Sequence, residues 1–202
     1  MTELSIARRT VLQRKIRLLI WATIAYNIIE AAVALTAGAR ASSTALVGFG
    51  LDSVIEVAAA AAVAWQFAAD DPERREKTAL RLIAWSFFAL AAYVAADSLA
   101  ALLGYSEARP SPVGIGLAAV SLAVMPLLAW LLIRAGREIG SRSTVADAKQ
   151  TLLCSYLSAV LLVGLGLNAW LGWSWADPVA GLAIAGFAVR EGLRAWRGDP
   201  CC

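Results

Sequence analysis

Long apolar runs separated by short polar segments dominate this chain. Each run is about as long as a helix that crosses a bilayer, which needs about 20 residues. The runs are unbroken and do not alternate in polarity, so they predict helices and not the strands of a barrel. Six such runs predict an all-α membrane protein with a six-transmembrane-helix bundle: Leu18–Ala37, Thr44–Ala69, Leu80–Leu103, Val113–Ile133, Asp147–Trp170 and Pro178–Trp196.

Glycine and proline mark several predicted boundaries. Gly38 follows the first run and predicts the end of its helix. Pro178 suits the first turn of the last helix, and Asp177 before it is predicted to cap that helix.

Composition leaves little room for anything outside the membrane. The 202 residues are 60% hydrophobic and 16% charged, whereas soluble domains are about 45–50% apolar and about 25% charged. We expect three parts: a basic cytoplasmic segment (1–17), a transmembrane domain (18–197) and a short tail that ends in two cysteines (198–202). No small-residue cleavage pattern follows the first run, so we expect a retained helix and not a signal peptide.

The distribution of Lys and Arg predicts the orientation. Of the 18 Lys and Arg residues, 16 lie in the N-terminal segment, the second-to-third and fourth-to-fifth connections and the C-terminal segment. Six spans place these four segments on one side, which the positive-inside rule identifies as the cytoplasm. We therefore expect cytoplasmic N- and C-termini and a multi-pass protein of the plasma (inner) membrane. Topology and lipid contact account for the basic residues, so the net charge of +3 indicates no nucleic-acid partner.

Several polar residues lie inside the apolar runs, where an ionised side chain costs about 2.5–3.5 kcal/mol on insertion scales. Such residues usually face the bundle interior and mark a pathway or a site. They are Glu30, Asp52, Glu56 and Asp97, the amides Asn27 and Gln150, and the thiol Cys154.

Asp52 and Glu56 are four residues apart, which places them on one helical face about one turn apart. Two carboxylates that close repel when both are ionised, so one keeps its proton unless a cation lies between them. The pair therefore predicts a cation or proton site. The alternative is a pair of neutral, hydrogen-bonded carboxyl groups in the core.

Gln150 and Cys154 are also four residues apart, near the cytoplasmic half of the fifth predicted helix. Taken alone, Cys154 is better explained as a small buried hydrophobic residue than as a ligand. The chain contains no histidine, so any metal site must use carboxylate, thiolate, amide or backbone groups.

Three segments in order resemble the cation diffusion facilitator family. Ser43–Glu56 resembles its second transmembrane helix, with a Ser-x-x-Leu lead before an acidic pair. Ala146–Cys154 is similar to the start of its fifth helix, and Trp175–Gly181 to the beginning of its sixth. The six predicted helices and cytoplasmic ends agree with this resemblance.

The resemblance implies export of divalent transition metal from the cytoplasm by a homodimer, in exchange for protons. It pairs the second and fifth helices, so that Asp52, Glu56, Gln150 and Cys154 form a four-point metal cage. A tetrahedral set with a thiolate favours Zn²⁺, with Cd²⁺, Co²⁺, Fe²⁺ and Mn²⁺ as alternatives. The metal is transported cargo, and we expect no permanently bound cofactor.

The chain departs from the family pattern at three of these positions. Glu56 replaces the second Asp, Gln150 stands at the usual His, and Cys154 stands at the usual Asp. We also expect the tail Gly198–Cys202 in place of the cytoplasmic domain that normally follows.

Further residues have weaker predicted roles. Asn27, Glu30 and Asp97 are candidates to line the pathway or relay protons, with a hydrogen-bonded packing role as the alternative. Cys201 and Cys202 are candidates to capture metal at the cytoplasmic mouth; an inert tail or lipid attachment is the alternative.

Two other functions remain open on the sequence. One is a non-transporting membrane metal sensor or scaffold related to cation efflux proteins. The other is a carrier of a different solute, or a membrane enzyme. The sequence has no nucleophile–base pair or nucleotide-binding glycine loop, so we expect no enzymatic activity.

Overall fold

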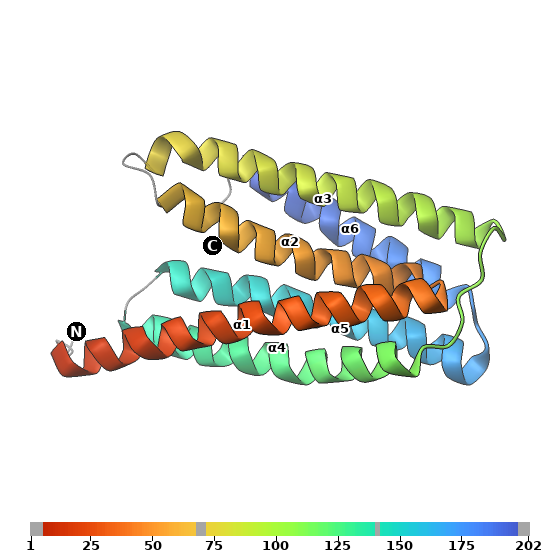
Figure 1. Cartoon of the computed structure of the whole chain (residues 1–202), viewed down its shortest axis with the longest axis horizontal. Helices are drawn as coiled ribbons and strands as arrows, with labels where there is room; N and C mark the ends of the chain where they lie inside the picture. Colours follow the sequence, from red (N-terminus) through yellow and green to blue (C-terminus); the bar gives the residue numbers. More distant parts are fainter. Residues whose placement is uncertain (1–5, 68–71, 140–141, 198–202) are drawn as a thin grey trace.

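The computed structural model describes residues 6–67, 72–139 and 142–197. Within these ranges the chain forms helices and no strand (Figure 1). This confirms the all-α fold with six helices: α1 (Ile6–Ala41), α2 (Thr44–Phe67), α3 (Pro72–Leu102), α4 (Pro112–Ile139), α5 (Arg142–Leu171) and α6 (Ala176–Arg197).

The helix α2 is central in the bundle. It contacts α1, α3, α5 and α6, while α3 packs on α6 and α4 packs on α5. In Figure 1, α3 and α6 lie on one side of α2, and α1, α4 and α5 lie on the other. The start of α1 and the end of α6 lie at the same end of the bundle. Polar side chains on α2 can therefore meet partners from several helices.

Every helix except α2 extends beyond its apolar run at one end or both, because the polar and charged residues there continue the same helical turns. The prediction that Gly38 ends the first helix was wrong, since α1 continues to Ala41. The chain turns at Ser42, which has a φ of 54°. Gly38 instead permits close packing of α1 on α2, because a Cβ there would lie 2.8 Å from Cγ2 of Val47.

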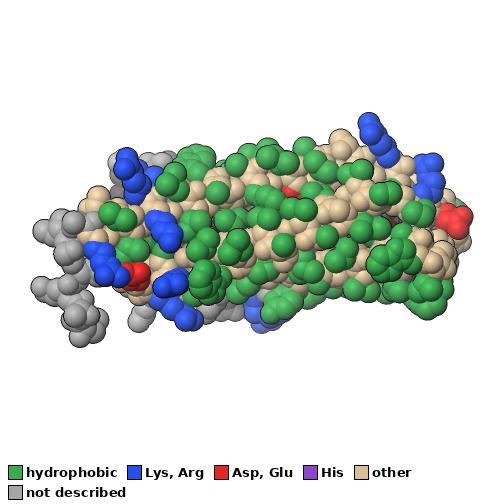
Figure 2. All heavy atoms as spheres, turned by 90° about the horizontal axis from the view of Figure 1, so that it is seen from below, with side chains coloured by type: hydrophobic (Ala, Val, Ile, Leu, Met, Phe, Trp, Pro, Cys, Tyr) green, Lys and Arg blue, Asp and Glu red, His purple; other side chains and the backbone are tan. Residues whose placement is uncertain are grey.

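The flank of the bundle is apolar. Figure 2 shows hydrophobic side chains along the length of one face, with Lys and Arg gathered mostly toward the ends. The exposed large side chains include Trp21, Trp85 and Trp130. Among the described residues, four helices, α1, α3, α4 and α5, contain stretches long and apolar enough to cross a membrane: Thr10–Ala41, Leu80–Leu102, Pro112–Glu138 and Cys154–Leu171.

Asp177 joins the start of α6 to the start of α2. Its carboxyl group is fully buried and accepts hydrogen bonds from Ser43 Oγ at 2.5 Å and from the Ala45 N–H at 3.4 Å. The prediction that Asp177 caps its own helix was wrong. The first turn of α2 contains no acidic residue, so its free N–H groups take their carboxyl partner from α6.

We expect Asp177→Ala to lower the free energy of unfolding by about 2 kcal/mol, because it removes a helix cap and leaves Ser43 Oγ without its acceptor. Thermal unfolding of the purified protein in detergent, followed by tryptophan fluorescence, measures this change. Glu107→Ala is the control, since Glu107 is exposed in the α3–α4 connection. An unchanged unfolding midpoint for Asp177→Ala would contradict the capping role.

Candidate functional site

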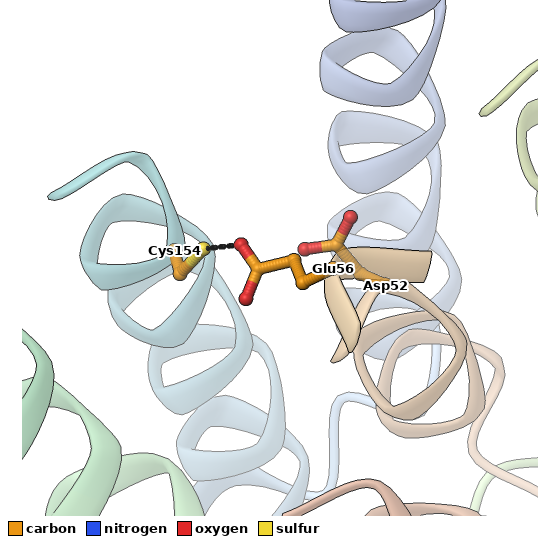
Figure 3. Close-up of side chains that lie close together, drawn as sticks. All are labelled: Asp52, Glu56 and Cys154. Carbon is orange, nitrogen blue, oxygen red and sulfur yellow. Dashed lines mark hydrogen bonds between the residues drawn. The ribbon is translucent and has the colours of Figure 1, made fainter. Parts of the chain in front are cut away.

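The candidate site lies between α2 and α5 at mid-length of the bundle. The contact between these helices confirms the pairing that the family resemblance implied. Asp52 and Glu56 lie one turn apart on α2, and Cys154 faces them from α5 (Figure 3). The Cys154 thiol donates a hydrogen bond to Oε1 of Glu56. Three chemically active groups that are up to 102 residues apart in sequence are thus brought together.

The geometry of these three residues suits a metal ion. One ligand atom from each residue lies within 4.8 Å of the others. The exposed fraction is 7% for Asp52 and 4% for Cys154, and Glu56 is half-buried. Two carboxyl groups and a thiol in such a place are costly unless they have a charged partner. Carboxylate and thiolate ligands together favour a borderline-soft divalent cation.

A fourth polar group reaches this site from α1. Asn27 Nδ2 donates a hydrogen bond of 2.7 Å to Oε2 of Glu56. The two oxygens of Glu56 therefore have different partners, Asn27 on α1 and Cys154 on α5. From the sequence, Asn27 was a candidate only for the pathway, for a proton relay or for packing, because nothing in its spacing predicted contact with Glu56.

Glu30 lies on α1 in a separate hydrogen-bond network. Its carboxyl group is buried and accepts from Ser53 Oγ of α2 at 2.9 Å and from Ser121 Oγ of α4. Tyr26 donates to the same Ser121 hydroxyl at 3.0 Å. The network ties α1 to α2 and α4 beside the candidate site. The sequence did not identify Ser121 and Tyr26, because a single serine or tyrosine in an apolar run does not by itself indicate a functional site.

Asp97 lies far from the candidate site along the bundle. It is five residues from the end of α3 and accepts a hydrogen bond of 2.8 Å from Thr44 Oγ1, at the first residue of α2. The sequence grouped Asp97 with Asn27 and Glu30 as a pathway candidate, whereas the structure places it near the end of α3.

Glu191 on α6 is a buried carboxylate that the sequence analysis did not select. It pairs with Arg194 at 3.1 Å. The sequence does not distinguish Glu191 from an ordinary exposed residue, because it lies among the basic residues at the polar end of α6. Its burial is what distinguishes it.

The remaining predicted site residues are not placed by the structure. Gln150 belongs to α5, but its side chain lies outside the part of the chain that the structure describes. Cys201 and Cys202 lie outside the described residues altogether.

Two comparisons with known proteins identify the family of this chain. An uncharacterized transporter of Synechocystis sp. is 32% identical over 96 residues, which are 43% of this chain and 31% of the relative. The chain therefore matches less than a third of the length of that relative. Residues 20–197 match the family model of the cation efflux transmembrane domain, a range that includes Asp52, Glu56 and Cys154. This match confirms the resemblance seen in the sequence, and the chain belongs to the cation efflux family.

Proposed function

We propose that this protein is a membrane carrier that exports divalent transition-metal cations, Zn²⁺ foremost, from the cytoplasm in exchange for protons. The observation that carries the proposal is the convergence of Asp52, Glu56 and Cys154 within 4.8 Å inside the bundle. Membership of the cation efflux family supports cation transport as the use of that site. The metal is the substrate of the carrier.

The proposed topology has six spans and cytoplasmic ends. The helices α2 and α6 have 24 and 22 residues and pack among the four helices that are long and apolar enough to cross a membrane. The start of α1 and the end of α6 lie at one end of the bundle. The basic residues concentrate in the segments at that end, which supports a cytoplasmic orientation in the plasma membrane.

The donor set supports Zn²⁺ as the preferred cargo. Zn²⁺ accepts carboxylate oxygen and thiolate sulfur in one site, whereas Mg²⁺ and Ca²⁺ require oxygen ligands. A single thiolate also admits Cd²⁺ and Co²⁺, so the preference among these ions depends on the oxygen ligands around it. We further propose, on the family resemblance, that two copies of the chain form the working unit.

Proton exchange follows from the same ligands. Metal binding requires ionised carboxylates and a thiolate, so each binding event releases the protons that the site holds. A carrier that opens alternately to the two sides then returns protons to the cytoplasm as metal leaves. The proton gradient across the plasma membrane would thereby drive export.

The test is transport into sealed liposomes that contain the purified protein. With protein in both orientations and an acidic lumen, we expect Zn²⁺ uptake and a simultaneous rise of lumenal pH, both absent from protein-free liposomes. A zinc-sensitive dye and a pH-sensitive dye inside the liposomes measure the two fluxes. Binding of Zn²⁺ without uptake would indicate a metal sensor, and uptake indifferent to an imposed pH gradient would refute proton exchange.

A further inference from the structure

At the candidate site, only one of the two polar atoms of the Asn27 amide has a hydrogen-bond partner among the described residues. Asn27 has an exposed fraction of 4%, and its Nδ2 donates to Glu56 Oε2 at 2.7 Å. Its Oδ1 is buried and accepts no hydrogen bond from the residues that the structure describes. Buried amide oxygens are almost always paired, because an unpaired acceptor away from water loses its solvation without compensation. This amide oxygen is therefore a buried acceptor that can take a partner when the occupancy of the site changes.

We propose that Oδ1 of Asn27 is an additional ligand of the transported cation. The inference rests on the proposed function, and it adds α1 to the α2 and α5 residues that bind the metal. Without a cation, the amide N–H stabilises the Glu56 carboxyl group by donating a hydrogen bond. With a cation present, a half-turn about the Cβ–Cγ bond exchanges the two amide atoms and presents oxygen in place of nitrogen.

The distance between Asn27 and Glu56 fits this exchange. Two oxygen ligands of one zinc ion, each at about 2.1 Å from it, lie about 3.0 to 3.4 Å apart. The observed separation of 2.7 Å between Nδ2 and Oε2 is slightly shorter, so the two side chains need to move apart by less than about 1 Å to hold a cation between them. A carboxylate at position 27 would repel Glu56 in the cation-free state. An amide can donate a hydrogen bond to Glu56 in that state and offer an oxygen ligand when a cation is bound. A cation bound in this way would connect α1, α2 and α5.

The first test compares the zinc affinity of the purified protein with that of two variants at position 27. Asn27→Leu removes both amide atoms, and we expect it to raise the dissociation constant at least about tenfold. Asn27→Asp keeps an oxygen ligand but lacks the N–H, and we expect an affinity equal to or higher than that of the wild type. Competition with a fluorescent zinc chelator measures all three.

Equal weakening of zinc binding in both variants would indicate that Asn27 acts only through its N–H. In that case Asn27→Asp loses the hydrogen-bond donor to Glu56, and its carboxylate repels Glu56. That result would overturn the proposal. The control is Asn168→Leu, because Asn168 is equally buried on α5 but donates to the Ala108 carbonyl, at 3.0 Å. The zinc affinity of Asn168→Leu should equal that of the wild type.

A second test detects the contact directly. The protein contains no histidine, so in the untagged variant Asn27→His any imidazole signal in the zinc X-ray absorption spectrum comes from position 27. We expect that signal in Asn27→His and not in Asn168→His. A zinc-loaded Asn27→His protein without it would overturn the ligand role even if Asn27→Leu fails to fold. A wild type that binds no divalent metal would instead refute the proposed function.

Discussion

Replacing Glu56 with glutamine should reduce metal transport at least about 100-fold and leave the protein folded in the membrane. Glu56 bonds Asn27 on α1 and Cys154 on α5, and it lies one turn from Asp52. Glutamine keeps the size of the side chain but removes the negative charge that a divalent cation requires. Loss of a residue that only orients a ligand costs about 10–100-fold, so loss of a charged ligand should cost at least as much.

The measurement is the initial rate of Zn²⁺ uptake into liposomes, normalised to the amount of reconstituted protein. Glu138→Gln is the matched control, because Glu138 forms an exposed ion pair with Arg8 near the end of α4. We expect that control to transport at the wild-type rate, and Asp52→Ala to fail as Glu56→Gln does. Normal transport by a well-folded Glu56→Gln protein would show that Glu56 is not a ligand of the transported metal.

Replacing Cys154 with aspartate should preserve transport but change which metal is preferred. The thiol of Cys154 is buried and bonds Glu56. A thiolate favours the softer Cd²⁺, whereas a third carboxylate favours harder ions such as Zn²⁺. We expect the ratio of Zn²⁺ to Cd²⁺ transport rates to rise about tenfold in Cys154→Asp.

Parallel uptake assays with the two metals at equal free concentrations measure this ratio. A protein in which Cys201 and Cys202 are both serine is the control for loss of thiols elsewhere, and its ratio of maximal rates should stay at the wild-type value. If the ratio in Cys154→Asp equals that of the wild type, Cys154 is a packing residue. Asp52 and Glu56 would then remain as the supported ligands.

The sequence determined the helical class, the number of helices and the acidic pair on α2. Each of these depends on local information. An apolar run of about 20 residues predicts a spanning helix by itself, and a spacing of four places Asp52 and Glu56 on one face whatever surrounds them. The same information misjudged Gly38, because helix termination and close helix packing both favour glycine, and only the neighbouring α2 distinguishes them.

Tertiary structure alone decided which groups meet across helices. The family resemblance implied that Cys154 faces α2, but spacing within α5 contains no information about its partner. Asn27, Glu30 and Asp97 had equal status in the sequence, yet packing places Asn27 on Glu56, Glu30 among serine hydroxyls and Asp97 beside the start of α2. Asp177 caps α2 and not its own helix for the same reason. Hydrogen bonds between helices depend on their relative position and rotation, which no single run of residues specifies.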